Sequence, residues 1–266
     1  MGRNQMVTLY EHPLSPYAQK VKIALREKNI AFDLKTPDAF GTGQARGDFM
    51  SVNPRGEVPV LIDGDIGVFD STVILEYIED KWPATPMLPK SPADRARARM
   101  LEEVCDTHYE AINWGLGEIG WFRRAEGALA ETLRDRAAEQ TEKLQAWLTR
   151  HLGARDWFNG ASFGWGDLSV VPYLADSIRF GNGPSESSPL GRWFARARTR
   201  ESVATTLRES AASTSAMETV ADIVKQGFFK REYRDHRLEW MIKSGGLEVV
   251  LQGLEKNNIR FSNDFQ

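Results

Sequence analysis

The first third of the chain switches between two patterns of hydrophobic positions. Residues 6–12 (MVTLYEH) alternate and carry β-branched and aromatic side chains, which is typical of a strand, whereas residues 20–30 (KVKIALREKNI) place apolar side chains at helical spacing. A short strand follows at 31–34, two more surround the DGDIG turn within 57–70, and residues 71–82 read as a helix. The predicted order is βαβ, a variable connection, then ββα.

A proline-rich segment, PATPMLPKSPADR, separates this part from the rest and cannot form a regular helix or a central strand. Beyond it, helical periodicity marks residues 93–114, 128–152, 165–178, 189–200 and 215–229, with hardly a strand candidate among them. We therefore predict an α/β plus all-α protein. Its first domain spans residues 6–85, an all-helical domain spans 92–229, and a C-terminal helical extension interrupted at SGG and KNN spans 230–266.

Composition narrows the classes of partner. The chain has 266 residues, 41% of them hydrophobic and 27% charged, which is ordinary for a soluble globular protein. A formal charge of -3 without a long basic run argues against binding to nucleic acid or an anionic membrane. No stretch reaches the roughly 20 apolar residues of a membrane span, and the N-terminus lacks an apolar signal core. We expect a cytoplasmic protein.

The single cysteine and four histidines of the chain show no ligand-like spacing, so no metal site is predicted. Cys105 lies in an apolar helical context, and we expect a small core residue there rather than a nucleophile.

Ser15 stands between Pro13 and Pro16, directly before the first helical pattern. Pro16 suits the first helical position, so Ser15 is predicted to be the N-cap, and capping alone would explain a serine here. A helix N-terminus also favours an anion in front of it, including a thiolate. A hydroxyl donating to a thiolate would lower the thiol pKa from its usual value of about 8.5.

Two further short motifs admit both a structural and a functional interpretation. Val58-Pro59 opens a strand pattern, where proline fits an edge or a turn; a trans bond is the default and a cis bond the special case. Asp70 and Ser71 start a helix and can serve as caps. Alternatively, Ser71 and backbone N–H groups would bind a carboxylate while Asp70 receives an ammonium group, as a zwitterionic amino-acid head group requires.

Together these motifs resemble the glutathione transferase family, whose members join a thioredoxin-like N-terminal domain to a helical C-terminal domain. The resemblance runs from residue 6 to about 225, over LYEHPLSPYAQKVKIALREKNI, NPRGEVPVLIDG, FDSTVILEYIEDKWP and FNGASFGWGDLSVVPYL. It implies that glutathione is the co-substrate and that the protein is a homodimer.

The resemblance also assigns roles. Ser15 matches the serine that hydrogen-bonds the glutathione sulfur, at a position where omega-like members carry cysteine. Val58, before an implied cis-Pro59, offers its backbone to the cysteinyl part, and Asp70 with Ser71 holds the γ-glutamyl end.

For the glycine carboxylate of glutathione, the candidates are Arg46, Gln44 and Arg55, and we favour Arg46. The family often has lysine or glutamine where Glu57 stands, and the carboxylate of Glu57 would repel that of the ligand.

An aromatic run follows in the helical domain. Tyr109, Trp114 and Trp121, together with Tyr17 near Ser15, are candidates to line a pocket for an apolar substrate, with a place in the helix core as the alternative. The C-terminal extension exceeds the usual family length and could cover this pocket. The helix start at GWGD has glycine where the family has serine or threonine, so half of a capping box is lost.

The expected activity is attack of the glutathione thiolate on an electrophilic, apolar or aromatic co-substrate. Conjugation is the default outcome, and serine-type relatives also cleave β-aryl ethers, displace halide or isomerise. The alternative is a non-catalytic binding or scaffold protein that retains the fold.

Overall fold

The computed structural model describes residues 6–38, 47–214, 217, 220–227, 233, 235–259 and 265. The N-terminal domain is built on a four-stranded sheet in the order β2-β1-β3-β4. β1 pairs in parallel with β2, and β3 runs antiparallel to both β1 and β4. The strands are β1 (Val7–Tyr10), β2 (Phe32–Lys35), β3 (Val60–Asp63) and β4 (Ile66–Phe69).

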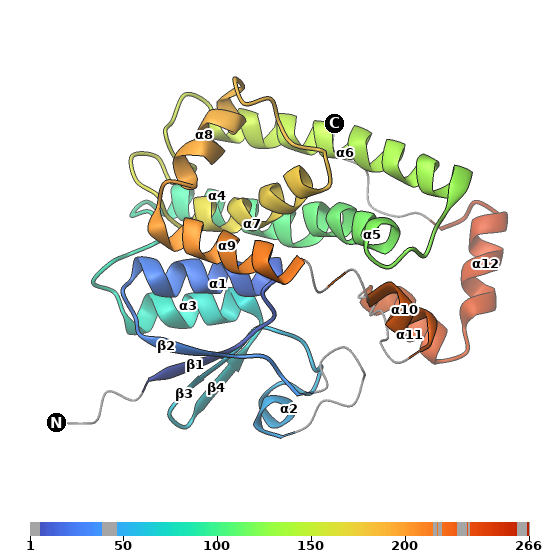
Figure 1. The fold of residues 1–266 in the computed structure, drawn as a ribbon, viewed down its shortest axis with the longest axis horizontal. Coiled ribbons are helices and arrows are strands. Elements are labelled where there is room, and N and C mark those ends of the chain that lie inside the picture. The colour runs from blue at the N-terminus through green and yellow to red at the C-terminus, as the bar shows by residue number, and fades with distance from the viewer. Residues whose placement is uncertain are drawn as a thin grey trace.

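Two helices, α1 (Pro16–Glu27) and α3 (Ser71–Lys81), lie between this sheet and the helical domain, and the short α2 (Asp48–Val52) interrupts the variable connection (Figure 1). The predicted order of strands and helices is confirmed, and the domain is thioredoxin-like.

The second domain is helical, as predicted. Its elements are α4 (Pro92–Val104), a π-helix (Cys105–Tyr109), α5 (Glu110–Gly120), α6 (Gly127–Leu152), α7 (Trp165–Arg179), α8 (Pro189–Ala197), α9 (Glu201–Thr214) and α10 (Val220–Lys225). The sequence reading missed α9, which lies across α1 (Figure 1).

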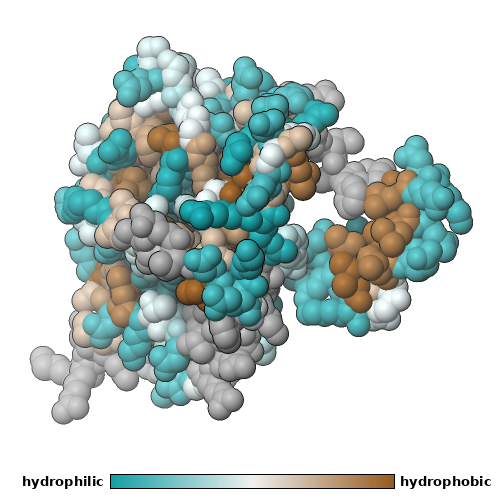
Figure 2. Space-filling view, turned by 45° about the vertical axis from the view of Figure 1, so that its right-hand side comes forward, coloured by the Kyte–Doolittle hydropathy of each residue, from teal (hydrophilic) through white to brown (hydrophobic). Residues whose placement is uncertain are grey.

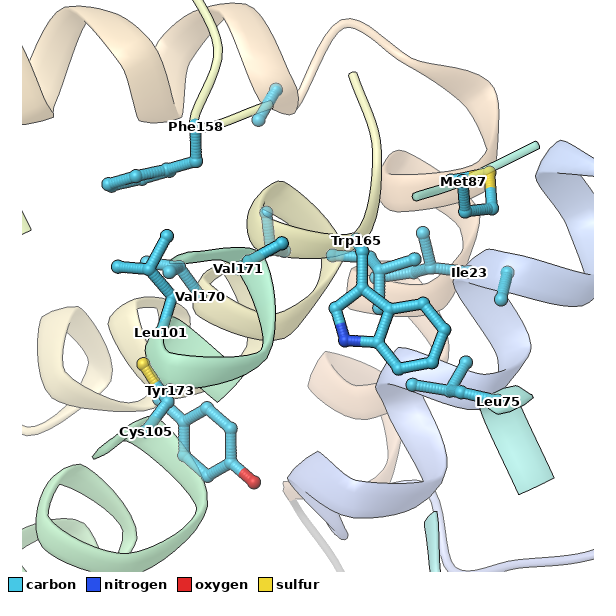
Figure 3. Packing of buried hydrophobic residues seen from close by; sticks show 14 of the residues in the cluster. Ile23, Leu75, Met87, Leu101, Cys105, Phe158, Trp165, Val170, Val171 and Tyr173 are labelled. Carbon is cyan, nitrogen blue, oxygen red and sulfur yellow. The ribbon is translucent and has the colours of Figure 1, made fainter. Parts of the chain in front are cut away.

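The core of the molecule crosses the boundary between the domains. Trp165, at the start of α7, is fully buried and packs with Ile23 of α1 and Leu75 of α3 (Figure 3). Cys105 is also fully buried, and burial first, then the charge of Asp106, raises the pKa of its thiol well above the usual value. The prediction of a core cysteine is confirmed.

The linker between the domains is held by side chains of the N-terminal domain. The Glu79 carboxylate of α3 accepts hydrogen bonds from the backbone N–H groups of Met87 and Leu88, both at 3.0 Å. Lys28, the C-cap of α1, lies 2.8 Å from the same carboxylate. Burial would raise the pKa of Glu79, but Lys28 and the two N–H groups outweigh it and lower that pKa.

The start of α7 shows why glycine replaces the family's serine or threonine. Asp167 accepts from the Gly164 N–H at 3.0 Å, so its half of the capping box is kept. The space on the other side is filled by the Asn159 amide, which donates to the Met87 carbonyl at 2.5 Å and accepts from Gly166 N–H at 3.0 Å. A Cβ on Gly164 would lie 1.8 Å from the Asn159 amide nitrogen.

Gly164→Ala is therefore expected to destabilise the protein by about 1–3 kcal/mol, the usual cost of overpacking. The matched control is Gly115→Ala within α5, where an added Cβ meets nothing within 4 Å. That change should stabilise the helix by up to about 1 kcal/mol. Urea denaturation measures both, and equal effects of the two substitutions would contradict the steric explanation.

The C-terminal extension forms two helices, α11 (His236–Lys243) and α12 (Leu247–Glu255), which project away from the two domains (Figure 1). Large apolar side chains cluster on this hairpin (Figure 2). Trp240, Val249 and Leu254 are 66%, 61% and 52% exposed. Among the described residues, no helix combines the length and apolar character needed to cross a membrane.

Candidate functional site

Strand register brings the three motifs to one edge of the sheet, the edge at which β1 and β4 end and β3 begins. Tyr10 at the end of β1 lies opposite Val60 at the start of β3, and Val60 lies opposite Phe69 at the end of β4. Ser15 follows β1, Val58-Pro59 precedes β3, and Asp70-Ser71 follows β4. The N-termini of α1 and α3 therefore open toward the same region.

Ser15 is the N-cap of α1, as predicted. Its Oγ accepts a hydrogen bond from the Ala18 N–H at 3.3 Å. A hydroxyl can accept through its oxygen and donate its hydrogen at the same time. The capping contact thus leaves the hydrogen to be donated to an anion in front of the helix.

Two other helices begin with the same Ser-Pro pair. Ser91 caps α4 and Ser188 caps α8, each through a backbone N–H of the helix's first turn. Capping alone therefore does not distinguish Ser15. Its position at the shared edge of the sheet does.

The loop before Ser15 is fixed by α9. Gln19 donates to the Pro13 carbonyl at 2.9 Å and to Ser210 Oγ of α9 at 3.3 Å. α9 therefore helps to position Ser15, although no motif marks this helix.

The buried charged side chains near Ser15 form ion pairs. Lys22 of α1 is fully buried, with Glu11 and Glu209 each 3.0 Å from its Nζ. Burial, followed by the charge of Lys22, lowers the pKa of His12. Both effects favour the neutral imidazole of His12.

The Val58-Pro59 peptide bond is cis, as the resemblance implies. Val58 is almost fully buried and packs with Phe49 and Val60.

Asp70 is the N-cap of α3 and Ser71 its first residue. Asp70 Oδ1 accepts from the N–H groups of Thr72 and Val73 at 3.0 and 3.3 Å. The φ of Asp70 is 73°, in the left-handed region, which costs a residue other than glycine about 1–3 kcal/mol. Such strain is frequent at ligand sites, and here it sets the direction of a carboxylate at the start of a helix.

Of the three candidates to bind the glycine carboxylate of glutathione, Arg55 alone lies within the described residues. Arg46 and Gln44 lie outside the described residues. Arg55 lies between two carboxylates instead: its Nε is 3.2 Å from Glu57 and its terminal nitrogen 3.8 Å from Asp70.

Three of the four predicted pocket residues are partly exposed. The Tyr17 hydroxyl donates to the Asp106 carbonyl at 2.7 Å, where the domains meet. Trp114 of α5 stacks edge-on against Tyr233 of the extension, with ring centroids 4.5 Å apart. Trp121 packs on Phe180 at the end of α7.

The pocket prediction for Tyr109 is wrong. Its side chain is fully buried, and its hydroxyl accepts from Gln145 at 3.0 Å. Burial raises the pKa of this phenol. The π-helix that ends at Tyr109 adds a residue to the turn, which rotates later positions by about 100° relative to α4. Tyr109 thus points into the core.

A thioredoxin-like domain with a cis proline beside two helix N-termini, followed by an all-helical domain, defines the glutathione transferase class of fold. Residues 9–86 match the family model described as glutathione S-transferase, N-terminal domain. Glutathione S-transferase U28 of Arabidopsis thaliana is 30% identical over 218 residues, which cover 79% of this chain and 92% of that protein. The chain belongs to the glutathione S-transferase family.

Solved structures agree. A glutathione S-transferase from Rhodospirillum rubrum F11 is 27% identical with a TM-score of 0.66, over 76% of this chain and 92% of that chain. Rice GST1 in complex with glutathione is 25% identical with a TM-score of 0.67, over 84% of this chain and 100% of that chain. Each match therefore leaves part of this chain uncovered.

Proposed function

We propose that the protein is a glutathione transferase in which Ser15 and the N-terminus of α1 stabilise the glutathione thiolate. The observation that carries this proposal is the arrangement at the sheet edge. The Ser15 oxygen accepts a capping hydrogen bond, which leaves the hydroxyl hydrogen available, and Ser15 lies at the same edge of the sheet as cis-Pro59 and Asp70. Glutathione spans this edge, with its cysteine along the Val58 backbone and its γ-glutamyl end at Asp70 and Ser71.

The thiolate attacks an apolar electrophile held beside the helical domain. Stabilising the thiolate lowers the thiol pKa, and holding both substrates together contributes by proximity. In the conjugation of an aryl chloride, the sulfur forms a bond to the ring carbon and chloride leaves with the bonding pair. Tyr17 and Trp114 are the proposed walls of this second site.

We further propose that the protein is a cytoplasmic homodimer. Ile66 of β4, Val73 of α3 and Met100 of α4 are apolar and 42% to 53% exposed. These side chains support the expected contact between the N-terminal domain of one copy and the helical domain of the other.

The extension contributes Tyr233 to the wall of the second site. Besides its contact with Trp114, the Tyr233 hydroxyl donates to Glu118 at 3.2 Å, and Arg124 lies 3.2 Å from Glu118 and 5.8 Å from the Tyr233 ring. Trp114 and Glu118 of α5, with Arg124 shortly after it, thus fasten Tyr233 of the extension. Figure 1 places α10 and α11 below α5, beyond the N-terminal end of α1.

Tyr233→Ala is expected to raise KM for a bulky aromatic electrophile about 5- to 10-fold, because an edge-on aromatic contact contributes roughly 0.5–1.5 kcal/mol beyond its buried area. KM for glutathione should not change. Steady-state kinetics with two electrophiles of different size measures the effect, and Trp240→Ala, on the exposed hairpin, is the control. An equal change in KM for both substitutions would show that Tyr233 does not line the second site.

The proposed function is tested by two measurements on the wild-type protein. Calorimetry should detect glutathione binding, and chlorodinitrobenzene should be converted to its glutathione thioether, followed by absorbance. Binding without turnover of any aryl, alkyl or epoxide electrophile would favour the scaffold alternative. Absence of both binding and turnover would reject the proposal.

A further inference from the structure

Arg55 occupies a specific position at the sheet edge. Its guanidinium lies over the Phe69 ring at 5.1 Å, with Glu57 on one side and Asp70 on the other. The loop that carries Arg55 is fixed by Asn53, whose side chain accepts from the Arg55 N–H at 3.0 Å and donates to the Glu57 carbonyl at 2.8 Å. Loop and ring together hold the guanidinium in place.

The two oxygens of Asp70 have different surroundings. Oδ1 caps α3, whereas Oδ2 is 3.8 Å from Arg55, beyond a direct hydrogen bond. The Asp70 side chain is 46% exposed and that of Arg55 39%, so a ligand can reach both groups. An acceptor and a forked cation this close together complement an α-amino-acid head group, with its ammonium on Asp70 and its carboxylate on Arg55.

We propose that Arg55 joins Ser71 in binding the α-carboxylate of the γ-glutamyl end of glutathione and that Glu57 positions Arg55. This inference rests on the proposed function, because it assumes that glutathione binds along this edge. The structure also changes the predicted role of Glu57. Its carboxylate is 10% exposed and paired with Arg55 at 3.2 Å, so it orients a cation toward the ligand instead of repelling the ligand's carboxylate.

The alternative is that Arg55 takes the glycine carboxylate at the other end of the tripeptide. Two truncated thiols separate the two assignments. γ-Glutamylcysteine lacks glycine, and cysteinylglycine lacks the γ-glutamyl group.

Arg55→Ala should weaken binding of glutathione and of γ-glutamylcysteine by the same factor, about 10- to 100-fold for a lost hydrogen bond between charged groups. Binding of cysteinylglycine should not change. Isothermal calorimetry on the wild type and the variant gives these constants. A loss for glutathione with γ-glutamylcysteine unaffected would assign Arg55 to the glycine end and overturn the proposal.

The positioning role of Glu57 has its own test. Glu57→Gln should weaken glutathione binding less than Arg55→Ala does, and it should have no further effect in the Arg55→Ala background, because its action passes through Arg55. Arg55→Lys should restore only part of the affinity, since lysine lacks the fork. Additive effects of Glu57→Gln and Arg55→Ala would show that Glu57 does not act through Arg55.

Arg97→Ala is the matched control. Arg97 is an exposed arginine paired with Asp94 on α4, and its loss should leave all three affinities unchanged. If the wild type binds glutathione and Arg55→Ala binds it equally well, this inference fails alone. If the wild type binds none of the three thiols, the proposed function fails as well.

Discussion

Lys20→Met is expected to lower the free energy of unfolding by about 3–5 kcal/mol, the cost of removing one partner from a buried ion pair. Lys20 of α1 is fully buried, with its Nζ 2.5 Å from Glu102 and also bonded to Asp106, both of the helical domain. Trp165 and Thr72 donate to the same Glu102 carboxylate. Without Lys20, two carboxylates would be left without their cation inside the domain interface.

The pKa of Lys20 agrees with this role. Burial acts to lower it, but the charges of Asp106 and Glu102 outweigh burial and raise it. A group whose pKa is higher in the folded state contributes stability below its unfolded value and loses that contribution only as the pH rises through the raised value. The contribution of Lys20 is therefore complete at neutral pH.

Urea denaturation at pH 7 measures the effect. The control is Lys143→Met on α6, which removes an exposed lysine 3.0 Å from Glu139 and should cost less than about 1 kcal/mol. Combining Lys20→Met with Glu102→Gln and Asp106→Asn should recover part of the loss, because no unpaired charge remains buried. If Lys20→Met costs no more than Lys143→Met, the interface does not depend on this cation.

Ser15→Ala is expected to lower turnover about 100- to 1,000-fold, the usual loss when one donor to a developing or fixed anion is removed. The pKa of bound glutathione should move back toward its value in water, about 8.5. Thiolate ultraviolet absorbance as a function of pH reports the pKa directly, and Ser15→Thr, which keeps a hydroxyl, should retain part of both properties.

The loss of a helix cap must be separated from the loss of a donor. Ser188→Ala removes an equivalent cap from α8, with the same expected cost of about 0.5–2 kcal/mol in stability. That variant should keep normal thiolate formation and turnover. Should Ser15→Ala behave like Ser188→Ala in all three measurements, Ser15 would be a cap and nothing more.

Much of the site follows from local sequence because each part is a helix or strand terminus. Ser15 before Pro16 and Asp70 before Ser71 are recognisable as caps without tertiary information, and the strand order places them together. The role of Arg55 does not follow in this way. Glu57 in place of a basic residue predicts repulsion until the side chain two positions earlier is seen to pair with it.

The missed and misplaced elements have physical reasons. α9 buries Ser202, Thr206 and Ser210 along with Val203, so its inner face is largely polar and lacks the apolar stripe by which amphipathic helices are recognised. Tyr109 is the last residue of a π-helix, and a periodicity counted from α4 loses its phase there. In both cases tertiary contacts determine the structure, and the local hydrophobic pattern does not indicate it.

The clamped linker has a consequence for how a bulky molecule enters. Glu79 holds the N–H groups of Met87 and Leu88 from one domain, while the Met87 carbonyl receives Trp165 N–H and the Asn159 amide from the other. A segment that is hydrogen-bonded to both domains does not act as a hinge, so the two domains do not open about it. A large electrophile must therefore reach the proposed second site without a change in the angle between the two domains.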